Sequence, residues 1–333
     1  MMAQTDRVVV GIDVAKDKAD ACIRSLSQRQ TFPSTTEGRR ALIRWLRKHK
    51  VGTAAMEASG GYERDWAKAL REAGIEARVV DPKRVRSFAQ SAGRLAKNDP
   101  IDALMIAWFA EVFIEAPGQT GDTARDKLVQ IVNARQNLLD MQTSLRNRSE
   151  HATPDVVQKM QARLLKKIAS EIVELEAAIT AMVKATPHFA ELAAIIESVP
   201  GLGKTTSAGL IAAMPELGQV RNEVAAALLG VAPYDNDSGQ RRGDRHIKGG
   251  RRKLRNLFYM ACLGAATRHN PVLKAFYDRL IAKGKEPKVA LTACMRKLIC
   301  IINTMIARRQ KWDAARSNAC NPARHLPSAC PAQ

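Results

Sequence analysis

Four acidic residues have types and positions suited to holding a divalent metal ion. Asp13 follows a glycine in VVVGIDVA, and Glu57 ends the apolar segment TAAME. Asp99 and Asp102 are three residues apart, so they share one face of a helix, and Pro100 after Asp99 is typical of a helix start. Two carboxylates about 4 Å apart repel by about 4 kcal/mol at an effective dielectric of 20, and a divalent cation removes that cost. Taken singly, each acid has an ordinary structural explanation as a turn residue, a strand end or a helix cap, and spacing alone favours that explanation.

The chemistry of these acids favours Mg²⁺, or Mn²⁺ in its place. A set of ligands made only of oxygen atoms selects these ions over zinc. Two such ions can activate a nucleophile and stabilise a leaving oxygen at phosphorus. The four acids therefore predict metal-dependent chemistry at a phosphodiester.

The elements around the acids predict a mixed sheet with helices on its faces, as in the ribonuclease-H-like fold. Ser34 and Glu37 have capping-box spacing, which predicts that the first helix starts there. If the strands that carry Asp13 and Glu57 are parallel neighbours, the two acids lie side by side. The predicted order is β-β-β-α-β-α-β-α-α, with strands in 7–23, at 30–32, 53–57 and 76–80, and helices at 34–48, 62–73, after 82 and from 99.

Residues 121–186 predict a helical pair. In the second helix, apolar residues recur in alternating steps of four and three: Ile168, Ile172, Leu175, Ile179 and Met182. Thr153 and Pro154 separate it from an earlier helix around 128–145. The pattern suits a coiled-coil arm for dimerisation and an ordinary two-helix packing unit equally well.

Residues 187–312 predict a second, mainly helical domain, and 313–333 predict a disordered tail. Its segment VPGLGKTT lacks the first glycine of a nucleotide-binding P-loop and follows a helix rather than a strand, which argues against an ATPase. A helix-hairpin-helix explains it better. Gly201, Gly203 and Lys204 could then hold a DNA phosphate at a helix N-terminus, or form a tight turn without a ligand.

A basic, glycine-rich loop follows, in LLGVAPYDNDSGQRRGDRHIKGGRRKLRNLF. Between Ser238 and Asn256 it has eight Lys or Arg residues and one Asp, a density that favours contact with phosphates over a merely solvated face. For His246, contact with a phosphate or a solvated position is favoured over the role of a general acid or base. Ser238 before a glycine is by itself typical of a turn. The predicted phosphate contacts are Arg241, Arg242, Arg245, Lys248, Arg251, Arg252 and Lys253.

The composition indicates an anionic partner. The 333 residues include 53 Lys or Arg against 33 Asp or Glu, a formal charge of +20. Nucleic acid is favoured over a membrane surface, because no stretch of about 18 uncharged apolar residues occurs. The run 298–306 predicts a buried helix. The N-terminus has no signal-peptide pattern, and six cysteines without metal spacing predict reduced thiols, so we expect a cytoplasmic protein.

Three stretches, GIDVAKDKADACI, AMEASGGYERDWAKAL and KNDPIDALMIAWFA, resemble the DEDD transposases of the insertion-sequence "one-ten" family. The pattern GVAP…SG…R-G…GG-R-R-x-L-R is similar to that family's transposase domain. The resemblance implies a RuvC-like domain at 1–120 whose metal ligands are Asp13, Glu57, Asp99 and Asp102. It also implies that Ser238 attacks DNA and forms a phosphoserine link. The YDND segment before this serine departs from the more basic run expected there.

The resemblance further implies a recombinase that works on donor and target DNA. It implies homodimers that assemble to a tetramer, active sites that combine domains of different protomers, and a structured bridge RNA that pairs with both DNAs. Two alternatives stay open from the residues alone. One is a metal-dependent junction nuclease that uses water in place of Ser238, and the other is a non-catalytic nucleic-acid-binding protein.

Overall fold

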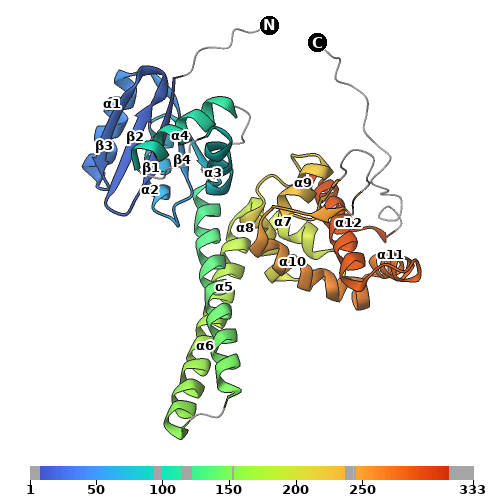
Figure 1. Ribbon diagram of the computed structural model, residues 1–333. Coiled ribbons are helices and arrows are strands. Elements are labelled where there is room, and N and C mark those ends of the chain that lie inside the picture. The colour runs from blue at the N-terminus through green and yellow to red at the C-terminus, as the bar shows by residue number, and fades with distance from the viewer. Residues whose placement is uncertain are drawn as a thin grey trace, which may run out of the picture. The chain divides into compact units, whose positions relative to one another are not determined.

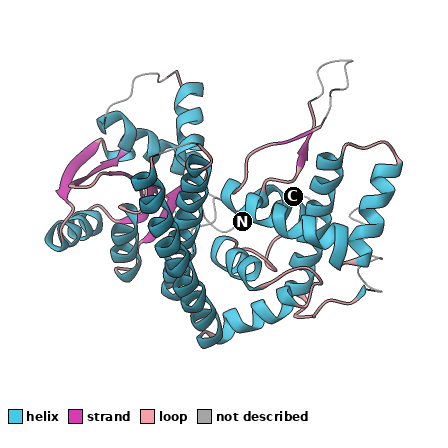
Figure 2. Ribbon diagram, turned by 90° about the horizontal axis from the view of Figure 1, so that it is seen from below, coloured by secondary structure: helices cyan, strands magenta, loops and turns pink. Residues whose placement is uncertain are grey.

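The computed structural model (Figure 1) describes residues 8–93, 99–113, 122–151, 154–236, 243 and 245–314, with only the backbone for 99–101. The chain divides into two compact units, Met1–Asp122 and Thr123–Gln333. Ser238, Arg241 and Arg242 lie outside the described residues. The five strands of the larger sheet belong to the first unit, and the regular structure in the described part of the second unit is helical apart from one short two-stranded ribbon (Figure 2).

The first unit contains a five-stranded mixed sheet in the order β3-β2-β1-β4-β5. The first three strands pair antiparallel, whereas β4 pairs parallel with both β1 and β5. The predicted order of strands and helices is confirmed. The strands are β1 (Val8–Val14), β2 (Lys18–Ile23), β3 (Gln28–Pro33), β4 (Val51–Glu57) and β5 (Glu76–Val80), and the helices are η1 (Arg24–Leu26), α1 (Thr36–Lys48), α2 (Glu63–Glu72), α3 (Pro82–Ser91) and α4 (Asp99–Val112).

Alternate residues of β1 face opposite sides of this sheet. Val10 and Ile12 belong to an apolar core that includes Leu42 of α1 and Trp66 of α2. These four side chains are at most 1% exposed. One face of the sheet is therefore covered by α1 and α2.

The other face is covered by α3 and α4. Val9 of β1 and Ala55 of β4 share a separate core with Val85 of α3 and with Ile106 and Phe109 of α4. Because both faces are buried, the central strands read as apolar runs rather than as an alternating pattern. The odd-numbered positions of β1 thus face α4.

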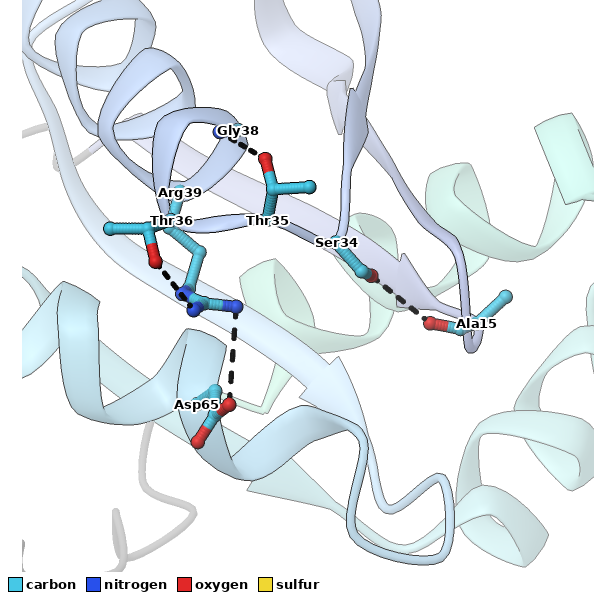
Figure 3. Close-up of polar contacts among 7 residues, drawn as sticks. All are labelled: Ala15, Ser34, Thr35, Thr36, Gly38, Arg39 and Asp65. Atoms are coloured by element: carbon cyan, nitrogen blue, oxygen red, sulfur yellow. Dashed lines mark hydrogen bonds and ion pairs between the residues drawn. The ribbon is translucent and has the colours of Figure 1, made fainter.

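Helix α1 begins one residue later than the capping-box spacing predicts. Thr35, not Ser34, is the N-cap: its backbone is extended and its side chain accepts a hydrogen bond of 3.1 Å from the amide of Gly38 (Figure 3). The Ser34 hydroxyl instead donates to the carbonyl of Ala15 at 3.3 Å. Both residue types are good caps, and the capping-box spacing favoured Ser34, which is not the one that caps the helix.

The second unit is built from helices around one large apolar core. Its three described cysteines, Cys262, Cys294 and Cys300, and Cys22 of the first unit form no disulfide and are buried thiols, as predicted. The elements are α5 (Thr123–Ser149), α6 (Asp155–Ala185), α7 (Pro187–Glu197), α8 (Lys204–Ala213), α9 (Asn222–Leu229), β6 (Pro233–Tyr234), β7 (His246–Ile247), α10 (Arg252–Gly264), the π-helix η2 (Ala265–His269), α11 (Pro271–Ala282) and α12 (Pro287–Ala307).

Helices α5 and α6 form the predicted pair and lie side by side along most of their length (Figure 1). Ile172 and Ile179, from the predicted apolar stripe, are buried. Arg135 of α5 donates two hydrogen bonds to Glu176 of α6, the first at 2.8 Å. Leu128 joins the core of the second unit, so the base of this pair is anchored there.

Helix α12 runs through the core of the second unit. Among the described helices, α12 is the single helix that is long and apolar enough to cross a membrane by itself. Helices α6 and α7 meet that test only when taken together, and they are bent by 109° relative to each other. Leu298, Ile299 and Ile302 of α12 are fully buried in the protein core. The prediction of a buried helix over this run is confirmed.

Candidate active site and nucleic-acid interface

Two of the four predicted acids lie on neighbouring strands. In the parallel pair β1–β4, Gly11 is opposite Ala55 and Ile12 is opposite Met56. The next position along each strand carries Asp13 and Glu57 respectively. Parallel partners in register point to the same face of the sheet, so both acids lie on the face that α4 covers. The predicted parallel neighbourhood is confirmed.

Helix α4 lies directly on β1 because Gly11 has no side chain. A Cβ at Gly11 would come within 2.2 Å of the carbonyl oxygen of Ala103 and 2.3 Å of the amide nitrogen of Ala107. Asp102, which precedes Ala103, therefore belongs to the turn of α4 that crosses β1. Asp13 is two residues beyond Gly11 and faces the same side, so three of the predicted acids come from two strands and the helix packed on them.

The burial of these acids is intermediate rather than complete. Asp13, Glu57 and Asp102 are each partly exposed. Asp99 is the first residue of α4, and its side chain lies outside the described part of the protein. Among the side chains that are described, no group of three or more His, Cys, Asp or Glu residues is arranged to hold a metal ion. Joint coordination by the four acids stays a prediction.

Asp20 is an additional acid in the same row. It lies opposite Asp13 in the antiparallel pair β1–β2. Its carboxylate pairs with Lys18 at 2.8 Å and accepts a hydrogen bond from the hydroxyl of Thr31. The sequence reasoning missed it, although a short turn after residue 14 sets this register. Three adjacent strands thus each carry one carboxylate at this level, in the order Asp20, Asp13 and Glu57.

The turn after Glu57 is organised by a buried carboxylate. Glu63 is 8% exposed and accepts hydrogen bonds from the amide and hydroxyl of Ser59, both at 3.0 Å, and from the amide of Gly61 at 2.8 Å. Burial by itself would raise the pKa of Glu63, but the hydrogen bonds from backbone amides outweigh it and hold this pKa below its ordinary value. Glu63 therefore shapes the loop that begins where β4 ends.

The loop that contains Ser238 begins and ends in a two-stranded ribbon. Pro233 of β6 pairs with Ile247 of β7, and Tyr234 pairs with His246. Beyond this pairing, Arg245 forms an exposed ion pair with Asp235 at 2.5 Å. The serine lies in the segment between the two strands, outside the described residues.

The described cations of this region differ in their surroundings. Lys248, Arg252 and Lys253 are exposed. Arg251 instead donates two hydrogen bonds to Glu216, at 2.9 Å and 2.5 Å. Burial alone would raise the pKa of Glu216, but the hydrogen bonds and charge of Arg251 lower it. Arg251 thus has a structural partner that the sequence pattern did not indicate.

The start of α10 is electrostatically unusual. Arg252 and Lys253 occupy its first turn, Arg251 is its N-cap, and no acidic residue lies in that turn. The N-terminus of a helix carries partial positive charge, so cations there are unfavourable unless an anion is nearby. This arrangement suits a phosphate group beside the exposed Arg252 and Lys253.

The predicted helix-hairpin-helix is formed by α7 and α8. Gly201 has φ +94°, and a Cβ there would come within 2.8 Å of Ala265, so this glycine is required by packing. Gly203 is the N-cap of α8 and has open space around it, and Lys204 beside it is exposed. A helix precedes this hairpin, as predicted, which is not the strand that a P-loop requires.

Comparison with known families decides the relationship. Residues 10–154 match the IS110 DEDD family model described as "Transposase", and residues 193–278 match the model described as "Transposase IS116/IS110/IS902 family". The chain belongs to the IS110 family of transposases. The suspected family resemblance is confirmed.

Relatives of this IS110 transposase cover most of its length. The "Pilin gene-inverting protein" of Moraxella bovis and that of Moraxella lacunata are each 25% identical over 316 residues, which is 92% of this chain and 98% of the relative. The "Insertion element IS110 uncharacterized 43.6 kDa protein" of Streptomyces coelicolor is 26% identical over 221 residues, 62% of this chain and 52% of that protein. The IS110 transposase is a DNA transposase or recombinase, and DNA is its substrate.

The two matched segments divide the candidate residues of the transposase. The first contains Asp13, Glu57, Asp99 and Asp102, and the second contains the hairpin and the basic loop with Ser238. The acids therefore lie in the segment that one family model matches, and the basic loop lies in the segment that the other matches.

Proposed function

We propose that this transposase cuts and rejoins DNA through a covalent link between Ser238 and DNA, with Asp13, Glu57, Asp99 and Asp102 holding Mg²⁺, or Mn²⁺ in its place. The domain that holds the ion is RuvC-like, a member of the ribonuclease-H-like fold. The observation that supports this most is the adjacency of Asp13 and Glu57 on parallel strands, on the face that α4 covers.

The residues fit a hard divalent cation. Every proposed ligand atom is a carboxylate oxygen, the donor type that Mg²⁺ and Mn²⁺ prefer. Asp13 and Glu57 bring two negative charges to neighbouring strand positions, an arrangement that a cation stabilises. When bound, the ion would supply positive charge at the scissile phosphate. Asp102 and Asp99 would complete the ligand set from α4.

Ser238 is the proposed nucleophile. Its Oγ forms a bond to phosphorus, the bond from phosphorus to one sugar oxygen breaks, and that oxygen leaves with the proton of the serine. Arg241, Arg242 and Arg245 would stabilise the charge that gathers on the phosphoryl oxygens. The hydroxyl of a second DNA end then reverses the reaction. Each step exchanges one phosphoester for another, so no ATP is needed.

The DNA rearrangement follows from the same chemistry. Two relatives that span nearly the whole chain are named for inverting a pilin gene, which supports exchange of DNA strands rather than cleavage alone. We further propose a bridge RNA that pairs with donor and target DNA, and dimers that assemble to a tetramer with active sites shared between protomers. The α5–α6 pair would form the contact between the two protomers of the dimer. A cytoplasmic location fits these partners.

The test uses trapping of the covalent intermediate. Wild-type protein with Mg²⁺ and labelled donor DNA should form an adduct that survives denaturing electrophoresis, and Ser238→Ala should form none. Asp13→Asn should slow adduct formation by about 10²–10³, the usual loss when a group that stabilises transition-state charge is removed.

Asp17→Asn is the matched control, because Asp17 is an exposed acid in the turn that follows β1. It should behave like the wild type. An adduct formed at the wild-type level by Ser238→Ala would sink the serine proposal, and unchanged kinetics in Asp13→Asn would sink the metal site.

A further inference from the structure

Three glycines close the base of the serine loop. Gly230, Gly249 and Gly250 have φ of 84°, 73° and 72°. A Cβ at Gly250 would lie 2.3 Å from both the Cα and the nitrogen of Gly230, and a Cβ at Gly230 would lie 2.5 Å from the carbonyl oxygen of Gly249. The two chain segments that flank the loop therefore touch backbone to backbone, with no space for a side chain.

Arg255 ties the same two segments together. Its Nη1 donates to the carbonyl oxygens of Gly230 and Gly249, each at 3.0 Å. A guanidinium nitrogen of this type has two hydrogens, so both are used. We call Gly230, Gly249, Gly250 and Arg255 the glycine clasp.

The clasp is supported from the neighbouring helices. The amide of Arg251, just before α10, donates to the carbonyl of Leu228 near the end of α9 at 2.9 Å. The Arg251 side chain is held by Glu216. The residues on both sides of the clasp thus have fixed partners within the second unit.

We propose that Arg255 and the glycine clasp position the serine loop for attack. This inference rests on the proposed function, in which Ser238 is the nucleophile. Residues 231–248 leave the clasp at one end and return to it at the other, with the β6–β7 pairing just beyond. Fixing both ends of a loop reduces the conformations open to the residues between them. Arg255 is then a positioning residue rather than a phosphate contact like the exposed Arg252.

The two adjacent glycines offer a matched pair of variants. Gly249 and Gly250 differ by 1° in φ, so alanine enters the left-handed region of φ at both positions. A Cβ at Gly249 has nothing within 4 Å, whereas one at Gly250 meets the backbone of Gly230. Gly250→Ala should therefore slow single-turnover adduct formation at saturating DNA by about tenfold to a hundredfold more than Gly249→Ala, because small misplacements of reacting groups cost about that much.

Arg255 is tested by three variants. Arg255→Gln should lower the same rate while leaving the DNA affinity and its salt dependence unchanged, and Arg255→Lys should restore much of the rate because one ammonium can donate to both carbonyls. Arg252→Gln, the control, should instead weaken binding and reduce the slope of log affinity against log salt by about 0.9. The proposal would be overturned if Arg255→Gln reduced the salt slope by the same amount. It would also be overturned if Gly250→Ala and Gly249→Ala formed the adduct at the same rate.

Hydrogen exchange separates this inference from the proposed function. In the full-length protein, Gly250→Ala and Arg255→Gln should speed exchange in residues 231–250 and leave the α5–α6 pair unchanged. A wild type without any adduct would overturn the proposed serine chemistry. A wild-type adduct with unchanged exchange in both variants would overturn the clasp alone.

Discussion

At the scale of single residues, Glu63 links the local chemistry of a turn to the position of a proposed metal ligand. Its carboxylate accepts three hydrogen bonds from Ser59 and Gly61, and this turn starts directly after Glu57. Hydrogen bonds to a charged acceptor are stronger than those to a neutral one. The charge of Glu63 therefore contributes to the stability of the turn.

We expect Glu63→Gln to lower the free energy of unfolding by about 1–3 kcal/mol at neutral pH, since a buried group loses part of its pairing. The folded pKa of Glu63 is below the ordinary value of 4.5, so its contribution is present above pH 4.5 and is lost as the pH falls through the folded pKa. Urea unfolding at a series of pH values measures the difference between variant and wild type.

Asp65→Asn is the control for this experiment, because Asp65 is in the same first turn of α2 but its side chain is 75% exposed. It should have little effect at any pH. A difference for Glu63→Gln that stays constant down to strongly acidic pH would contradict the assigned role of the carboxylate.

At the scale of elements, the start of α1 shows where sequence patterns stop being decisive. Two consecutive cap residues precede the helix, and spacing alone favoured Ser34. Gly38 packs so closely on the carbonyl of Pro33 that a Cβ would come within 1.9 Å of it. The close contact between Pro33 at the end of β3 and Gly38 in the first turn of α1 occurs together with Thr35 as the N-cap of this helix. Arg39 then bonds the hydroxyl of Thr36 and pairs with an acid of α2 at 3.9 Å (Figure 3).

The cap assignment predicts unequal effects of two neighbouring substitutions. Thr35→Ala removes the hydrogen bond to the amide of Gly38 and should destabilise the protein by about 1 kcal/mol. Ser34→Ala removes one exposed bond of 3.3 Å and should change stability by at most about 0.5 kcal/mol. Urea midpoints of the two variants measure this, and the reverse ranking would contradict Thr35 as the cap.

Other elements followed the sequence closely. The strands and helices of the first unit were predicted in order because each has a local signature, such as a β-branched run or a capped amphipathic stretch. The stripe with Ile172 and Ile179 predicted the α5–α6 pair for the same reason. Whether that pair also mediates dimers depends on a second chain, which no pattern within one chain reveals.

At the scale of the whole molecule, the formal charge of +20 exceeds what a few phosphate contacts would use. The exposed cations at the start of α10 are one part of this excess. Such a surface attracts any nucleic acid in proportion to the phosphates it neutralises. Charge alone therefore cannot distinguish a guide RNA from DNA.

The proposed guide RNA predicts a specific outcome. RNA that co-purifies with the full-length protein from cells carrying its element should be dominated by one structured species when it is sequenced. Washing in high salt should remove bulk RNA first, because contacts to phosphates alone weaken steeply with ionic strength. A random RNA pool after such a wash would count against guidance and leave the strand chemistry untouched.

The sequence by itself determined the order of elements in the first unit, the α5–α6 helical pair and the residue types suited to chemistry, since these depend on composition and on spacing along the chain. Only the tertiary structure decided that Asp20 stands in a row with Asp13 and Glu57, that Arg251 pairs with Glu216, and that Arg255 joins Gly230 to Gly249. These contacts join residues that are distant in the chain or on different elements. They depend on strand register and close backbone packing, which local patterns do not encode.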